Sequence, residues 1–157
     1  MQKDWQEVLD RFRYGIYLVS IVIEGQDNAM IASWVAQCSH EPPLVSLAIR
    51  NNRLSCGQIQ QAGAFCISVL PQDSLGLIKQ FKIPDWHRKF EGLSCRRSPH
   101  GALIPDIVIG YLDCTLEHAI AAGDHTLFIG RAVAGAFLNN SDPLSTADYG
   151  GNYRGDR

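Results

Sequence analysis

Apolar and polar positions alternate along much of this chain, a pattern that predicts strands rather than long helices. In residues 43–50 the alternation places Val45, Leu47 and Ile49 on one face, as expected for a strand with one buried side. Glycine, proline, asparagine and aspartate separate such segments, and these residues favour turns, the first of them at residues 25–28. Strands are therefore expected over residues 16–24, 30–39, 43–50, 64–70, 93–97, 107–118 and 125–138.

Helical spacing is limited to short segments. Asp4 is expected to cap a first helix that ends near Gly15, because apolar residues recur at helical spacing between them. Further helices are expected over residues 56–62 and 74–82, and one more helical turn over residues 85–90. Strands do not alternate with long crossover helices. The sequence therefore predicts a mainly β (β/α+β) fold, a closed antiparallel barrel with short peripheral helices.

Length, composition and charge narrow the classes of partner. The chain has 157 residues, of which 46% are apolar and 19% charged, and this suits a single domain over residues 1–157. A formal net charge of -2 gives no reason to expect nucleic acid or an anionic membrane as a partner. No apolar run reaches the roughly 20 residues of a membrane span, and the first residues lack a secretory pattern, so a cytoplasmic protein is expected.

The cysteines predict neither disulfides nor a metal centre. They are odd in number and scattered, so free thiols are expected rather than a disulfide framework. No Cys-x-x-Cys pair occurs, and no two histidines have the spacing that would place both on one helix face, so no metal site is expected. Cys38 and His40 come nearest to a ligand pair, and a small buried thiol beside a turn histidine is the preferred interpretation of them.

Small residues on two of the expected strands suggest a bound ligand. Opposite its apolar face, the segment 43–50 carries Leu44, Ser46, Ala48 and Arg50. The side chains on this face become smaller along the strand, and the last residue is a cation. In the segment 30–39, small or polar residues surround the large side chain of Trp34: Ala32, Ser33, Ala36, Gln37, Cys38 and Ser39. Small side chains let the backbone approach a flat molecule closely, although they could also simply fit beneath neighbouring helices.

The residues that follow favour the first of these two interpretations. Ser55 and Gln58 have the spacing of a capping box, which predicts a helix whose first N–H groups lack intrahelical partners. Arg50, Asn51 and Arg53 precede this helix and add charge and hydrogen-bond donors, as a phosphate site requires. The alternative is an ordinary capped helix beside two solvated arginines. Together with the small residues on the two expected strands, this cationic helix start predicts a phosphorylated planar cofactor.

Several motifs occur in order along the chain: YGIYLVSIV, MIASWVAQCSHEPPLVSLAIRNNRLS, AGAFCISVL, KQF, KFEGL, GDHTLFIGRA and DPLSTADYGGNY. This series resembles the flavin reductase-like, FMN-binding split-barrel family, above all the reductase modules associated with diiron flavoproteins. The resemblance implies a closed split β-barrel and a homodimer that binds FMN, or alternatively FAD, without a covalent bond. It implies that the cofactor contacts are Met30, Ala32, Ser33, Trp34, Ser39, Ile49, Arg50, Asn51, Arg53 and Ser55.

The resemblance also implies an activity, transfer of a hydride from NAD(P)H to flavin, after which electrons pass to a partner protein or another acceptor. Two alternatives stay open, a non-enzymatic FMN-binding electron-transfer module and a pyridoxamine-phosphate-oxidase-like FMN-binding protein. His125, in the GDH motif, is the candidate catalytic residue, in contact with nicotinamide or the flavin edge, or else an ordinary turn residue. Its partner is expected to be the backbone turn rather than Asp124, because adjacent strand residues point to opposite faces.

Aromatic residues outside these motifs are expected to have mainly structural roles. Trp34 could stack on the flavin or pack as an ordinary core residue. The side chains expected to pack within the peripheral helices are Phe81, Trp86 and Phe90. Near the end of the chain, Tyr149 and Tyr153 could reach across a dimer or be exposed.

Overall fold

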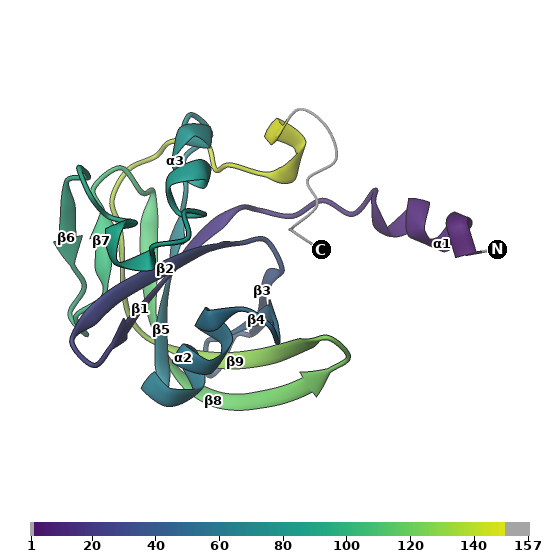
Figure 1. The fold of residues 1–157 in the computed structure, drawn as a ribbon, viewed down its shortest axis with the longest axis horizontal. Helices are drawn as coiled ribbons and strands as arrows, with labels where there is room; N and C mark the ends of the chain where they lie inside the picture. Colours follow the sequence, from purple (N-terminus) through teal and green to yellow (C-terminus); the bar gives the residue numbers. More distant parts are fainter. Residues whose placement is uncertain (1, 150–157) are drawn as a thin grey trace.

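The computed structural model describes residues 2–149, which form a mainly β structure with a few short helices (Figure 1). Seven antiparallel strands make one sheet in the order β2-β1-β5-β8-β9-β4-β3. A two-stranded sheet, β6-β7, lies beside it. The strands are β1 (Tyr17–Ile23), β2 (Gln26–Ala32), β3 (Val35–Ser39), β4 (Leu44–Arg50), β5 (Ala64–Val69), β6 (Cys95–Arg97), β7 (Leu103–Pro105), β8 (Gly110–Ala122) and β9 (His125–Phe137).

The helices are short and peripheral, as predicted. They are α1 (Gln2–Leu9), α2 (Leu54–Ala62), α3 (Leu75–Gln80) and the 3-10 turns η1 (Trp86–Arg88) and η2 (Thr146–Tyr149). The first helix ends at Leu9, earlier than the predicted end near Gly15, and projects away from the sheet (Figure 1). Its apolar residues are exposed: Trp5, Val8 and Leu9, together with Phe12 just beyond it.

The strand predicted over residues 43–50 is confirmed as β4, and its burial alternates as the sequence indicates. Val45, Leu47 and Ile49 are all buried in an apolar cluster that also receives side chains from β1, β5, β9 and α2. A second apolar cluster lies on the other face of β1 and is covered by α3 and the β6-β7 pair. The face of β4 opposite the core can therefore line a cleft at the surface of the protein.

The segment 30–39, predicted as one strand, is two strands at opposite edges of the sheet. Ser33 and Trp34 link β2 to β3, and the backbone N–H of Ala48 donates to the carbonyl of Trp34 at 3.0 Å. Within residues 2–149, no ladder pairs β2 with β3. The antiparallel sheet is thus confirmed, whereas the predicted closure of the barrel is not.

Two local predictions need correction. The first hairpin turns at Glu24 and Gly25, whose φ angles are 51° and 76°, and not at residues 25–28. Two successive residues with positive φ match the right-handed twist of a tight hairpin, so β2 can begin at Gln26. The segment 93–97 yields only β6, and β7 was not expected. No helix among the described residues is long and apolar enough to cross a membrane.

Substitution of Gly110 tests the packing of β8 against β9, because the backbone of this residue lies against β9. A Cβ atom at this position would lie 2.6 Å from the carbonyl oxygen of Ala136, which is backbone and cannot move aside easily. We expect Gly110→Ala to lower the free energy of unfolding by about 1–3 kcal/mol. Gly57→Ala is the matched control, because nothing lies within 4 Å of its Cβ position in α2. That control should raise the free energy of unfolding slightly, by up to roughly 1 kcal/mol. Urea denaturation measures both, and a Gly110→Ala protein as stable as the native one would contradict this packing.

Candidate functional site

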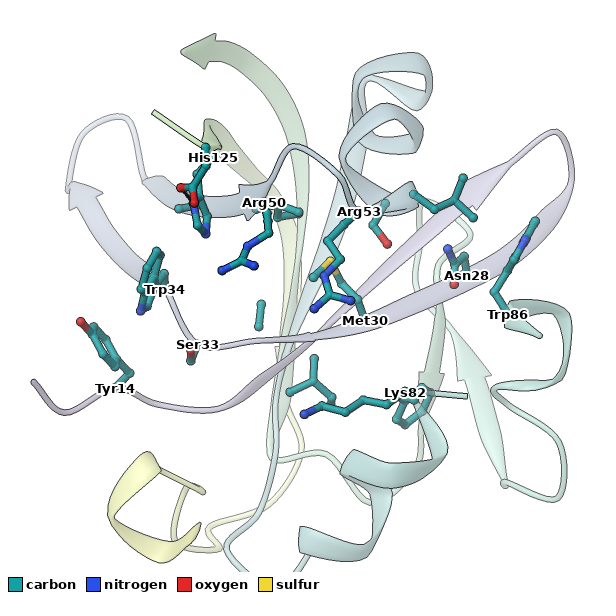
Figure 2. Close-up of a pocket in the computed structure, with 18 of the residues that line it drawn as sticks. Tyr14, Asn28, Met30, Ser33, Trp34, Arg50, Arg53, Lys82, Trp86 and His125 are labelled. Atoms are coloured by element: carbon teal, nitrogen blue, oxygen red, sulfur yellow. Dashed lines mark hydrogen bonds and ion pairs between the residues drawn. The ribbon is translucent and has the colours of Figure 1, made fainter. Parts of the chain in front are cut away.

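A cleft of about 970 Å³ opens where β2, β4 and the start of α2 come together (Figure 2). The link between β2 and β3 forms one part of its wall, and the loop after α3 forms another. Most of the residues predicted from the sequence line it: Met30, Ala32, Ser33, Trp34, Ile49, Arg50, Arg53, Ser55 and His125. Residues distant in the sequence are therefore brought together as a single site, of which Ile49 is also a core residue, only 1% exposed.

One end of the cleft is aromatic. The rings of Trp34 and His125 have centroids 4.7 Å apart with an interplanar angle of 33°, and the ring of Tyr14 lies 6.2 Å from that of Trp34. His125 is the cross-strand neighbour of Arg50 in the pairing of β4 with β9. Residues paired in this way project to the same face, so the imidazole and the guanidinium border the same space.

His125 is held by its neighbour in the chain, contrary to the expectation from strand alternation. Its Nδ1 lies 2.6 Å from Oδ1 of Asp124. Asp124 belongs to the tight turn before β9, where Gly123 has a φ of 63°, so its side chain does not follow the strand pattern. The hydrogen bond from His125 lowers the pKa of Asp124, and the positive charge of Arg50 adds to this effect. The carboxylate therefore fixes the imidazole at the mouth of the cleft.

Two predicted contacts, Asn51 and Ser39, lie outside the residues that line the cleft. Asn51 instead supports the turn that carries His125, because its backbone N–H donates to the carbonyl of Asp124 at 2.9 Å. Its side-chain oxygen accepts from the hydroxyl of Thr126 at 2.7 Å. Ser39 ends β3, where its carbonyl accepts from the side-chain amide of Gln37.

The middle of the cleft is cationic. Arg50 and Arg53 extend into it from the β4 side, and Lys82 extends from the loop after α3 (Figure 2). Lys89 also lines the cleft and donates from Nζ to the carbonyl of Ala29 at 2.6 Å. Burial lowers the pKa of Lys89, and the charge of Arg53 lowers it further. Such a concentration of positive charge favours an anionic ligand.

The predicted capping box at the start of α2 is wrong. The helix begins at Leu54, the N-cap is Arg53, and no side chain caps it. Ser55 is buried at 5% exposure in the first turn. The amide oxygen of Gln58 accepts from Asn28 on β2 at 2.5 Å, so it is not directed toward the backbone of the cap. The residue spacing was correct for a capping box, but contacts between α2 and β2 determine where these side chains point.

The other end of the cleft was not predicted. Trp86 and Asn28 line it (Figure 2). Leu54 at the start of α2 also lines the cleft. Trp86 was expected to pack with the peripheral helices, as Phe81 and Phe90 do, whose rings meet edge to face at 5.3 Å. No local spacing signals this end, because its residues come from β2, α2 and η1 and meet only in the folded chain.

The cysteines are free thiols, as predicted. Cys38 was expected to be buried, but it is exposed on the edge strand β3, whereas Cys56, Cys66 and Cys114 are buried. Burial raises the pKa of Cys66 well above its usual value, and the nearby charge of Asp113 adds to it. Burial likewise raises the pKa of Cys114 to about 12. Within the described residues, no three His, Cys, Asp or Glu side chains are grouped so that they could hold a metal ion.

Comparison with known proteins identifies similar chains. The family model for the flavin reductase like domain matches residues 9–155. A flavin reductase of Pseudomonas putida is 33% identical over 127 residues, which cover 80% of this chain and 74% of that protein. A high molecular weight rubredoxin of Moorella thermoacetica is 30% identical over 147 residues. That match covers 91% of this chain but only 64% of the relative's length.

A solved structure has the same fold. The nitrilotriacetate monooxygenase component B homologue of Mycobacterium thermoresistibile superimposes with a TM-score of 0.83 and 27% sequence identity. The superposition covers 92% of this chain and 81% of the other. The arrangement of strands around the cleft therefore recurs in a protein that has diverged considerably in sequence.

Thiol chemistry tests the burial of the cysteines in the sheet. In native protein we expect iodoacetamide to label Cys38 readily, because only an accessible thiolate reacts. Cys66 and Cys114 should stay unlabelled until the chain is unfolded, since both are buried and their pKa values are raised. Peptide mass mapping before and after denaturation locates the labels. Rapid native labelling of Cys66 would show that the sheet opens far more easily than this packing allows.

Proposed function

We propose that this chain, which belongs to the flavin reductase like domain family, is an oxidoreductase. It binds flavin in the cleft and reduces it with NAD(P)H. The flavin is FMN, or the FMN half of FAD. The observation that carries this proposal is the order of groups along the cleft, in which an aromatic end with His125 and Trp34 continues into a cationic middle with Arg50 and Arg53.

The cationic middle suits the flavin phosphate. Arg53 is the N-cap of α2, so its side chain and the first N–H groups of the helix project from the same short stretch of backbone. A helix start carries partial positive charge, and an arginine beside it adds a full one. Arg53 and Ser55 are the proposed phosphate ligands, with Lys82 facing them from the opposite wall.

The walls beside the phosphate site suit a flat ring. Ala32, Ser33 and Ala48 line the cleft between β2 and β4, and their small side chains leave room next to the backbone. Trp34 and Met30 border the same space with larger apolar surfaces that exclude water. A flavin held against these residues would supply an acceptor for the hydride of reduced nicotinamide. The chain's own contribution is to hold the two rings together.

His125 is the proposed nicotinamide-positioning residue. Asp124 accepts the hydrogen bond at Nδ1, which leaves Nε2 as the atom available to a ligand. Arg50 borders the same space and can hold a negatively charged group of the dinucleotide. Asn51 acts on this end indirectly, since it holds the turn that contains Asp124.

Two kinds of protein partner are proposed, a second copy of this chain and a redox protein. A homodimer is supported by the exposed apolar residues of α1, such as Trp5 and Val8, which a second copy could cover. A redox partner is supported by two of the similar proteins, one named as a rubredoxin and one as a component of a monooxygenase. The same two names favour a second candidate function, a flavin-containing electron carrier that receives electrons from another protein.

Anaerobic mixing with NADH or NADPH distinguishes the two candidates. For a reductase, the absorbance of bound flavin near 450 nm should bleach within seconds, because hydride transfer needs no further protein. For an electron carrier, bleaching should be slow with either nucleotide and fast only with a reduced protein donor. Stopped-flow absorbance provides the measurement. If the purified protein binds no flavin in a titration, both candidate functions are wrong.

A pair of variants tests the assignment of His125 and Asn51. We expect His125→Ala to raise the KM for the nicotinamide substrate roughly tenfold and to leave flavin affinity unchanged. Asn51→Ala should change KM in the same direction, because it loosens the turn that carries His125. Asn52→Ala is the matched control, an exposed asparagine that does not line the cleft. A loss of flavin affinity in Asn51→Ala would instead favour the direct cofactor contact predicted from the sequence.

A further inference from the structure

Two serine hydroxyls are buried in the sheet without a hydrogen-bond partner among the described residues. Ser20 on β1 is 1% exposed and Ser68 on β5 is 0% exposed, and the Oγ atom of each is unpaired. A buried hydroxyl without a hydrogen bond destabilises a folded protein. Each of these groups therefore needs a partner other than the side chains and backbone around it.

The strand register places both hydroxyls on one face of the sheet. Ser20 is the cross-strand neighbour of Cys66, and Ser68 lies two residues after Cys66 on the same strand. Cross-strand neighbours project to the same face, and so do residues two apart on one strand. Ser20 and Ser68 are thus diagonal neighbours, with Cβ atoms about 7 Å apart. One water molecule can bridge their hydroxyls, because each of its hydrogen bonds spans about 2.8 Å.

Short side chains surround the two serines beneath a cover of longer ones. Ala29 on β2 pairs with Ser20, and Cys66 pairs with it from the other side. Ala29 and Cys66 belong to an apolar cluster that also contains Ile104 on β7 and Phe81 after α3. Because the residues of the sheet are short at this point, they leave room beneath the cover for a molecule no larger than water.

The neighbouring thiol does not pair with the serines. Cys66 is the cross-strand neighbour of Asp113, a carboxylate that is 3% exposed and accepts from the backbone N–H of His100 at 3.2 Å. Burial raises the pKa of Cys66, the charge and hydrogen bonding of Asp113 add to this, and the nearby hydroxyl of Ser68 acts in the opposite direction. The S–H proton is therefore committed to Asp113. The sulfur is only a weak acceptor for a hydroxyl.

The groups around the two hydroxyls favour water over other ligands. Asp113 brings negative charge to the same side of the sheet, which disfavours an anion. An apolar molecule would leave both hydroxyls unpaired. Among residues 2–149, no three His, Cys, Asp or Glu side chains are grouped so that they could hold a metal ion. Water both donates and accepts, and a buried water typically makes about three hydrogen bonds to groups of this kind.

We propose that Ser20 and Ser68 together bind one internal water molecule, which lies against Cys66 on the face of the sheet that β7 covers. The water gives each hydroxyl the partner that the chain does not supply, and the sulfur provides a weak third contact. It joins β1 to β5 through their side chains, in addition to the backbone ladder between them. Neither serine lines the cleft, so this site does not depend on the proposed function.

Removal of one hydroxyl distinguishes a hydrated site from a dry one by the sign of its effect on stability. If water fills the site, Ser20→Ala should lower the midpoint of urea unfolding, because the water and Ser68 then lose hydrogen bonds. In a dry site the same change removes an unpaired buried hydroxyl, so the midpoint should stay the same or rise. An unchanged or raised midpoint would overturn the proposal. Ser74→Ala is the matched control, a buried serine whose Oγ donates to the carbonyl of Pro71 at 2.5 Å, and it should lower the midpoint.

A double-mutant cycle tests whether the two serines share one water molecule. Ser20→Ala combined with Ser68→Ala should lower the midpoint by less than the sum of the two single changes, because either change alone already disrupts the shared water. Ser20→Ala combined with Ser74→Ala should be additive, since Ser74 has a partner of its own. Additive effects of Ser20→Ala and Ser68→Ala would show that the two hydroxyls have separate partners, contrary to the proposal.

A high-resolution crystal structure observes the site directly and does not depend on the stability of any variant. Native protein should show the density of one water within hydrogen-bond distance of both Oγ atoms, and crystals of Ser20→Ala should show it weakened or lost. Native crystals without density at this position would contradict the proposal. Density of a heavier ion at the same position would also overturn it, because the site would then belong to a cation.

Discussion

The site depends on one short crossing of the chain from one edge of the sheet to the other. Only Ser33 and Trp34 separate β2 from β3, which lie at opposite edges, and the hydrogen bond from the N–H of Ala48 to the carbonyl of Trp34 holds the crossing against β4. The crossing brings the end of β2 beside the outer face of β4. The cleft follows from this contact, since its small-residue walls come from those two strands.

The second constraint is electrostatic. Arg50, Arg53, Lys82 and Lys89 all line the same cleft. Burial lowers the pKa of Lys89, and the charge of Arg53 lowers it further. Such a group of cations attracts an anionic phosphate. A ligand that binds the folded chain there should therefore stabilise the fold.

Local patterns in the sequence predicted some of this site, and long-range contacts determined the rest. The alternation in residues 43–50 correctly placed Val45, Leu47 and Ile49 in the core, because a strand with one buried face leaves a period of two. The sequence of segment 30–39 did not indicate the crossing from β2 to β3, because it contains no glycine, proline, asparagine or aspartate. Gln58 was misassigned to a helix cap because its partner, Asn28, is distant in sequence. The position of Trp86 in the cleft was missed for the same reason, because the other residues that line the cleft come from separate elements.

The central claim is that a flavin is anchored by its phosphate at the start of α2. Comparing FMN with riboflavin, which lacks only the phosphate, tests it most directly when done with native protein and with Arg53→Gln. We predict that native protein binds FMN at least about tenfold more tightly than riboflavin, because charge-assisted hydrogen bonds contribute roughly this much. Arg53→Gln should lose most of that difference while binding riboflavin as before. Equal affinities for FMN and riboflavin in the native protein would contradict the claim.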